Sequence, residues 1–377
     1  MNSKERVKAV MELKTPDRVP LLCQFSIGHM LRQLDESPVL FWFDVDTYVK
    51  GLLKLREIYN FDGILISLHG HSDKWKDEIN GFDTYDDFDL IEWKNGDSTK
   101  FLHNDLPVHT FKEERIFPEI STFDINTIPK VLDYIPVSQD LYFPIDLKDK
   151  FKSINKIIEK CGKDYSIHGE ITSPFDYYLD LFGHQDSLLN LLFEPDKVKE
   201  ILQHFTVLVK NLAVEMCHTG IDAIKLSSPF AGAGFISPDS YREFVLPYEK
   251  QIAEAIRNNG VHIYTHTCGS INDRLELMFE AGISGIECLD PPPLGDVELD
   301  DAFERIPSTG FIKGNIDSIA SLLSGTREEV INDAKNRLQI GMKYKNFILS
   351  TACSIAPDVK RENIQALYEA VTKYGNY

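Results

Sequence analysis

The sequence lacks most of the features that mark secreted and membrane proteins. It has only six cysteines in 377 residues, and their positions show no paired spacing, which excludes a disulfide scaffold. No apolar run approaches the roughly 18 residues that a membrane-spanning helix needs. The first twenty residues contain no apolar core of a signal peptide. We therefore expect a cytoplasmic protein with reduced thiols and no membrane partner.

Positive charge is also scarce. The chain carries 40 Lys and Arg against 59 Asp and Glu, a formal net charge of -19. Phosphate backbones are bound by clustered Lys and Arg, so we expect no nucleic-acid partner. With 43% hydrophobic residues, a chain of this length can bury a large core, which suits one barrel-sized domain or two smaller ones.

What the sequence does contain is a regular alternation of short β-branched runs and longer amphipathic segments. Six such runs follow residue 165, each with a helical segment after it, and two more precede them. The eight runs are 18–26, 61–69, 165–172, 222–230, 261–269, 284–291, 308–316 and 346–355. Eight βα units in order predict an α/β fold, a (β/α)8 TIM barrel. A doubly wound sheet is the less favoured alternative, because such sheets usually have fewer strands.

Residues 73–145 interrupt this rhythm. They are polar and rich in turn residues, and they contain the hairpin signals "NGFD" at 80–83 and "KNGDS" at 94–98. We expect a β-rich insertion between strands 2 and 3, near the mouth of a single barrel domain that spans residues 1–377. A surface elaboration without a role is the alternative interpretation.

The stretch "VHIYTHTCGSIND" places an imidazole and a thiol where a strand is expected to end. Side chains two apart in a strand share a face, so His266 and Cys268 point the same way. Neutral imidazole and thiolate are good zinc ligands. An isolated pair of this kind is more often structural than metal-binding, so the other strand ends decide the question.

Two other predicted strands end in candidate ligands. Cys353 ends the last run, and Glu287 and Cys288 end the run 284–291 on opposite faces. In a barrel, the C-terminal ends of the strands converge around one pocket. We therefore predict a metal site made by His266, Cys268 and Cys353, with Glu287 as a displaceable fourth ligand. Three firm protein ligands are typical of catalytic rather than structural zinc.

Other strand ends supply candidate catalytic and binding residues. His168 and Glu170 share a face, and with Glu287 they are the candidate catalytic groups. Their alternative role is that of satisfied polar groups in the core. Gly314 and Asn315 end the run 308–316, where glycine permits close approach of a ligand, so we expect them to contact a cofactor.

Two weaker candidates complete the set. His69 and His71 follow the second run and are interpreted as a loop pair more readily than as substrate ligands. Asp176 and Tyr177 follow a Ser-Pro turn, where they would line the pocket.

Several motifs resemble one known superfamily over nearly the whole chain. They are "TPDRVP", "GEITSPFDYYLDLFG", "HTCGSINDRLELMFEAGISGIECLDP", "GFIKGNID" and "NFILSTACSIAPDVKRENIQALYEAV". The chain resembles the superfamily that joins uroporphyrinogen decarboxylase to the zinc- and cobalamin-dependent methyltransferases, such as the methylcobamide:coenzyme M methyltransferases. The resemblance implies a (β/α)8 barrel. By match, His266, Cys268 and Cys353 hold zinc and Glu287 is the acidic fourth ligand, while Cys288 is expected to face away.

The resemblance also implies a reaction. In the methyltransferase branch, zinc holds a substrate heteroatom while a methyl group moves to or from a corrinoid in an SN2-type step. The corrinoid would be carried by a separate partner protein, which would dock at the barrel mouth. The small substrate would be a methoxy-aromatic or methylamine donor, or a thiol acceptor such as coenzyme M. The direction of transfer, the substrate and the oligomeric state stay open.

Two alternatives remain at this point. Members of the decarboxylase branch carry an arginine- and glycine-rich motif after strand 1 that binds the substrate's carboxylates. Here the corresponding stretch, "CQFSIGHMLRQLDES", has Arg32 as its only cation, and a porphyrinogen would need more positive charge. The second alternative is a non-catalytic module that binds zinc or a corrinoid.

Overall fold

The computed structural model describes residues 1–67, 73–137 and 141–377 of the chain. Seven parallel strands form one curled sheet in the order β1-β8-β9-β10-β11-β12-β13. Their bounds are Gly63–Ile66 (β1), Ser166–Thr172 (β8), Ala223–Ser227 (β9), His262–Thr267 (β10), Gly285–Cys288 (β11), Phe311–Ile316 (β12) and Phe347–Thr351 (β13). Each lies inside a run that the sequence predicts as a strand, because β-branched residues fit a sheet buried on both faces.

The segment 18–26 closes the sheet into a barrel without forming a regular strand. Single β-bridges join Leu21 to Leu349 and Phe25 to Ile355 on the β13 side. On the other side, the Asp62 amide donates to the Leu21 carbonyl at 2.8 Å, just before β1. The predicted strand is therefore replaced by bridged extended chain, and Pro20, which has no N–H, cannot donate to a ladder there. The predicted (β/α)8 architecture is confirmed.

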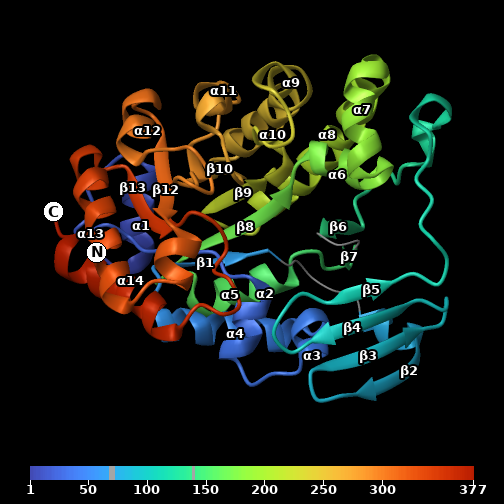
Figure 1. Cartoon of the computed structure of the whole chain (residues 1–377), viewed down its shortest axis with the longest axis horizontal. Coiled ribbons are helices and arrows are strands. Elements are labelled where there is room, and N and C mark those ends of the chain that lie inside the picture. Colours follow the sequence, from blue (N-terminus) through green and yellow to red (C-terminus); the bar gives the residue numbers. More distant parts are fainter. Residues whose placement is uncertain (68–72, 138–140) are drawn as a thin grey trace.

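Helices cover the outside of the sheet (Figure 1). The α-helices are Ser3–Met11 (α1), Ile27–Gln33 (α2), Pro38–Phe43 (α3), Val45–Tyr59 (α4), Lys152–Cys161 (α5), Pro174–Phe182 (α6), His184–Phe193 (α7), Pro195–Cys217 (α8), Pro238–Phe244 (α9), Leu246–Asn258 (α10), Leu275–Glu280 (α11), Leu299–Arg305 (α12), Arg327–Tyr344 (α13) and Arg361–Tyr374 (α14). Short 3₁₀ turns cover Asp73–Glu78, Ile120–Thr122, Ile125–Thr127, Pro229–Ala231 and Asn272–Arg274, and a π-helical turn covers Ser318–Leu323. Within the described ranges, no helix combines the length and the hydropathy of a membrane span.

Local chemistry sets several of these boundaries. Ser173 caps α6 by accepting from the Asp176 amide, and Pro174 fills the first helical position. Two helices, α9 and α10, follow β9 in place of one continuous helix, and they meet at Val245. Pro247 accounts for the break, because its ring and missing N–H disfavour the interior of a continuous helix.

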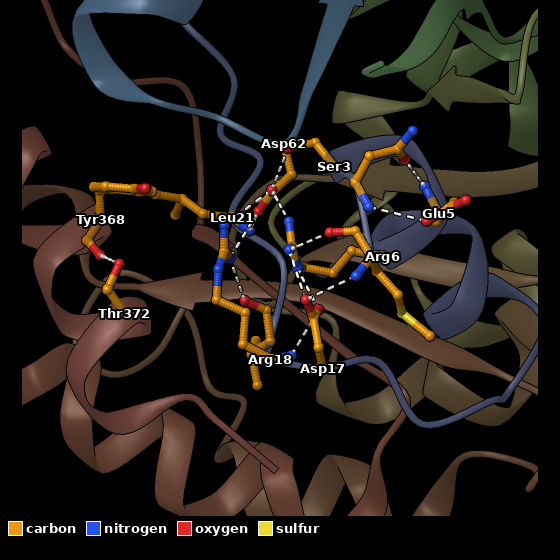
Figure 2. A network of polar contacts seen from close by, with 12 residues as sticks. Ser3, Glu5, Arg6, Asp17, Arg18, Leu21, Asp62, Tyr368 and Thr372 are labelled. Carbon is orange, nitrogen blue, oxygen red and sulfur yellow. Dashed lines mark hydrogen bonds and ion pairs between the residues drawn. The ribbon is translucent and has the colours of Figure 1, made fainter. Parts of the chain in front are cut away.

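A buried ionic network holds the N-terminal end of the barrel (Figure 2). Asp62, which is fully buried just before β1, accepts from Arg6 Nη1 at 2.7 Å and from Arg18 Nη1 at 2.9 Å. The same carboxylate accepts from the Leu21 amide at 2.8 Å. Asp17 in turn pairs with Arg6 Nε at 2.7 Å. These bonds tie α1 and the bridged segment to β1, at the opposite end of the strands from the candidate metal ligands.

The segment 73–145 contains two small antiparallel sheets, one at the lower right of Figure 1 and one at mid-height, right of centre. One contains β2 (Ile79–Thr84), β3 (Phe88–Trp93), β4 (Ser98–Leu102) and β5 (Val108–Thr110), and the other contains β6 (Tyr134–Val137) and β7 (Leu141–Pro144). The turn predicted at 94–98 joins β3 to β4. The turn predicted at 80–83 is wrong, because Gly81 lies within β2 at a register shift, where an irregular strand uses glycine. The assignment of residues 1–377 to one barrel domain stays a prediction.

Candidate metal centre and cavity

Four side chains at the C-terminal ends of three strands form a compact group of soft ligands. They are His266 in β10, Cys268 just after it, Cys288 at the end of β11 and Cys353 just after β13. One ligand atom from each lies within 4.8 Å of all the others. His266 Nε2 is 3.3 Å from Cys268 Sγ, which is 3.8 Å from Cys353 Sγ. The structure thus brings together the three side chains that the sequence predicts as ligands, and it adds Cys288 as a fourth candidate.

The side chain of Cys288 does not face away, in contrast to the expectation from strand alternation. The backbone φ is 88° at Cys288 and 58° at Leu289, so the chain leaves the extended conformation at the end of β11. Alternation of faces holds only while the strand stays extended. Left-handed φ at two non-glycine residues has no signature in the sequence, which is why the predicted direction of this thiol is wrong.

Glu287 lies outside the four-residue group and behind the imidazole. Its Oε2 is 3.2 Å from His266 Nδ1, and its carboxylate forms ion pairs with Lys313 and, at 3.8 Å, with Lys225. Lys225 also pairs with Glu170 Oε1 at 2.7 Å. This placement differs from the expectation that Glu287 is the fourth ligand. Both lysines are fully buried. Each interrupts an apolar run, "AIKLS" or "FIKGN", and this pattern is the sequence signal that could have identified Lys225 and Lys313 as functional candidates.

The pKa values of three of these four side chains are shifted by burial and by their contacts with one another. Burial lowers the pKa of His266, but the negative charge of Cys268 and hydrogen bonds with the thiols raise it to about 9. Hydrogen bonds from Cys268 and Cys288 hold the pKa of Cys353 well below its ordinary value. Burial raises the pKa of Cys288 well above that of a free thiol. A metal ion that binds here would displace protons from thiol and imidazolium.

A cavity of about 360 Å³ opens beside this group. Barrel strand ends contribute Glu170, Ser227 and Ser354, and Ser354 directly follows Cys353. The insertion contributes Asp105, Leu106, Arg115, Phe117, Ile135, Pro136, Val137 and Phe143. Residues 73–145 therefore form part of the wall of the cavity at the C-terminal end of the strands.

Asp176 lines this cavity, as expected, whereas Tyr177 is buried and donates to the Tyr134 carbonyl at 3.0 Å. Burial raises the pKa of Asp176 to about 8, with a contribution from the nearby Glu249 carboxylate. Ser173 Oγ donates to Asp176 Oδ2, while Oδ1 has no hydrogen-bond partner among the described residues. Asp176 is therefore mostly protonated in the cavity wall at pH 7.

Three further candidates lie in the barrel interior rather than at the cavity. His168 is fully buried, lies 3.0 Å from both Ser166 Oγ and Tyr264 Oη, and has a pKa lowered by burial. A Cβ on Gly314 would lie 2.8 Å from the Cys288 carbonyl oxygen, so close backbone packing explains this glycine. Asn315 Nδ2 donates to the Leu289 carbonyl at 3.0 Å. The catalytic and cofactor roles of these residues stay predictions.

The pair His69 and His71 lies outside the described residues. Glu170, by contrast, lines the cavity and is partly buried. Burial acts to raise the pKa of Glu170, but the positive charge of Lys225 and its hydrogen bond lower it overall. Of the expected acid–base pair His168 and Glu170, the structure thus places Glu170 at the cavity and His168 in the barrel interior.

Comparison with known proteins finds one matching family and several similar proteins. The family described as uroporphyrinogen decarboxylase (URO-D) matches residues 111–374. The methylcobamide:CoM methyltransferase MtbA of Methanosarcina acetivorans is 28% identical over 224 residues, which cover 59% of this chain and 62% of that protein. The methylcobamide:CoM methyltransferase MtaA of Methanosarcina barkeri is 28% identical over 249 residues, 65% of this chain and 69% of that protein.

Two further comparisons bear on the branch and on the fold. A uroporphyrinogen decarboxylase of Prochlorococcus marinus is 28% identical over 181 residues, 47% of this chain and 48% of that protein. A solved structure, a methyltransferase from Methanosarcina mazei, superposes with a TM-score of 0.74 over 99% of both chains at 20% sequence identity. This last likeness concerns the fold alone.

Proposed function

Because this chain belongs to the uroporphyrinogen decarboxylase family, we propose that it is a zinc-dependent methyltransferase that moves a methyl group between a corrinoid protein and a small substrate. The convergence of His266, Cys268 and Cys353 beside a substrate-sized cavity carries this proposal. The names of the methyltransferase relatives support it. The match spans only 62% of the length of the first of these relatives. The reaction and the partner protein are therefore proposals for this chain.

The donor set fits zinc. Sulfurs bound to one tetrahedral zinc at about 2.3 Å lie about 3.8 Å apart, and Cys268 Sγ and Cys353 Sγ are 3.8 Å apart. Thiolates and imidazole select zinc over calcium or magnesium, which prefer oxygen ligands. When bound, zinc would act as a Lewis acid toward a substrate oxygen, nitrogen or sulfur.

The cavity supplies the positioning that methyl transfer needs. Its described lining includes the aromatic side chains Phe25, Tyr48, Phe117, Phe143 and Phe230. A volume of about 360 Å³ is in the range of pockets for small organic molecules. It exceeds the need of a very small thiol and favours a ring-sized methyl donor, such as a methoxy-aromatic or a larger methylamine. Apolar walls of this kind exclude water and hold the two reacting atoms in line.

Porphyrinogen decarboxylation is not favoured by the cavity. Among the described lining residues, Arg115 and His184 are the only basic ones. Arg115 donates from Nη2 to the Asp180 carbonyl at 2.7 Å and lies 3.5 Å from the Asp180 carboxylate. A substrate with many carboxylates would need several arginines or lysines to offset its charge.

The test combines metal analysis with transfer assays. Purified protein is analysed for zinc and incubated with methylcob(III)alamin and a panel of thiols that includes coenzyme M. The reverse direction is followed as methylation of cob(I)alamin by methoxy-aromatics and methylamines. We expect zinc-dependent transfer in one direction, lost in Cys353→Ala. Zinc-free protein whose activity is unchanged in Cys353→Ala, or metal-free decarboxylation of a porphyrinogen, would overturn the proposal.

A further inference from the structure

We propose that Cys288, and not Glu287, completes the zinc site, and that Glu287 is a positioning residue that acts through His266. The inference rests on the proposed function, because it concerns the ligands of the same zinc ion. It assigns different roles to two residues that are adjacent in sequence.

Cys288 is held in place to serve as a ligand. Its Sγ lies within 4.8 Å of the ligand atoms of His266, Cys268 and Cys353, and the residue is fully buried. The left-handed backbone at Cys288 and Leu289 directs this side chain to the group. The Asn315 side chain fixes that turn by donating to the Leu289 carbonyl at 3.0 Å.

The neighbouring strand also fits against this turn. Gly314 of β12 pairs in register with Cys288, and any Cβ there would lie 2.8 Å from the Cys288 carbonyl oxygen. The conformation that turns Cys288 inward is therefore supported from two sides, by a side-chain hydrogen bond and by close backbone packing.

Asp290 gives Cys288 a second partner. The thiol donates to Asp290 Oδ2 at 3.3 Å, and the same oxygen accepts from the Gly269 amide at 2.8 Å. Asp290 thus links the turn after β11 to the loop that carries Cys268. If a substrate displaced Cys288 from the ion, the freed thiolate would take up a proton, from a substrate thiol or from water. The resulting thiol could then donate to Asp290 Oδ2 and keep a hydrogen-bond partner, so the fourth position would open as a catalytic site requires.

Glu287 is engaged elsewhere. One oxygen faces His266 Nδ1 at 3.2 Å and Lys225 Nζ at 3.8 Å, and the other pairs with Lys313. If the carboxylate left to bind the metal ion, the buried Lys313 would lose its ion-pair partner and Lys225 would keep only Glu170, which is unfavourable. A carboxylate hydrogen-bonded to the far nitrogen of a ligand histidine fixes the tautomer and orientation of the imidazole. Here that arrangement turns His266 Nε2 toward the thiols.

X-ray absorption at the zinc edge, together with chelator competition, tests this division of roles. The samples are the zinc-loaded wild-type chain, Cys288→Ser, Glu287→Gln and the control Cys161→Ser, whose buried thiol in α5 donates to the Ile157 carbonyl away from the site. We expect three sulfurs and one nitrogen in the wild type and in the control. Cys288→Ser should show two sulfurs. Glu287→Gln should keep three sulfurs while zinc affinity falls roughly 10- to 100-fold.

The outcomes separate this inference from the proposed function. A wild-type spectrum with two sulfurs that Cys288→Ser leaves unchanged would overturn the assignment of Cys288, while the zinc enzyme would stand. A Glu287→Gln protein that has lost one light-atom ligand would overturn the positioning role. A wild-type chain that takes up no zinc would overturn both proposals. The wild-type spectrum decides the ligand count even if one variant fails to fold.

Discussion

At the scale of single residues, alternation along a strand and convergence of strand ends account for most of the candidate site. His266 and Cys268 share a face because they are two apart, and Cys353 reaches them because β13 ends at the same side of the barrel. The same rule failed at Cys288, where a left-handed backbone follows the strand. The partners of Glu287 could not be predicted either, because the register of neighbouring strands is not written in one sequence.

Removal of one predicted ligand should release the metal. In Cys353→Ala, zinc would lose one sulfur ligand, and we expect its affinity to fall by more than about 100-fold, beyond the effect of removing a hydrogen-bond partner of a ligand. Zinc retained per chain during dialysis against a chelator measures this. Cys217→Ser, which changes a buried thiol in α8, is the control. Equal zinc retention in the two variants would contradict the assignment of Cys353.

Asp176 should make stability depend on pH. Its pKa is about 8 in the folded chain and about 4 when unfolded. This contribution to stability is fully present below about pH 4 and is lost as the pH rises through about 8. Asp176→Asn removes the titration, so we expect the variant to gain stability over the wild type as the pH rises, by a few kcal/mol at pH 9.

Chemical denaturation at pH 5 and pH 9 measures this difference. Asp186→Asn, at an exposed position on α7, is the matched control and should show no such trend. A difference between Asp176→Asn and the wild type that is the same at both pH values would show that Asp176 ionises normally in the folded chain.

At the scale of elements, the alternation of β-branched runs and amphipathic segments located seven strands, because buried parallel strands need continuous apolar residues. Tertiary context decided the rest. The segment 18–26 has strand composition but forms only bridges, and the helical segment after β9 breaks into α9 and α10 before Pro247. Gly81 also shows that a glycine typical of a turn can lie within an irregular strand.

The network around Asp62 should stabilise the N-terminal end of the barrel. In Asp62→Asn, Arg6 and Arg18 would lose their buried counter-charge, so we expect a loss of about 3 kcal/mol in the free energy of unfolding. Glu280→Gln, which breaks the exposed ion pair with Arg242, should change it by less than about 1 kcal/mol. Equal midpoints of urea denaturation for the two variants would show that the network contributes little.

At the scale of the whole molecule, the insertion and the barrel share one cavity. Figure 1 shows the sheet β2–β5 beyond the barrel strands, and Arg115 and Phe117 bring the insertion chain to the cavity that Glu170 and Ser227 line. Composition predicted a β-rich insertion near the mouth but not which of its residues face the cavity. That depends on packing between segments far apart in the chain.

Zinc should stabilise the whole fold, because its proposed ligands come from the ends of β10, β11 and β13. An ion that binds only the folded chain adds about 2.7 kcal/mol at a hundredfold excess over its dissociation constant, which raises Tm by a few degrees. We expect this rise with zinc in thermal scans of the metal-free wild type and no rise with magnesium, which prefers oxygen ligands. An equal rise in metal-free Cys353→Ala would place the stabilising zinc elsewhere.

Diffraction data collected on both sides of the zinc absorption edge, from crystals grown with zinc, would locate the ion. We expect one strong anomalous peak at the C-terminal ends of β10, β11 and β13, about 2.3 Å from Cys268 Sγ and Cys353 Sγ and about 2.0 Å from His266 Nε2. A map without a peak there, or with Cys353 Sγ pointing away from the ion, would contradict a zinc centre at the mouth of this barrel.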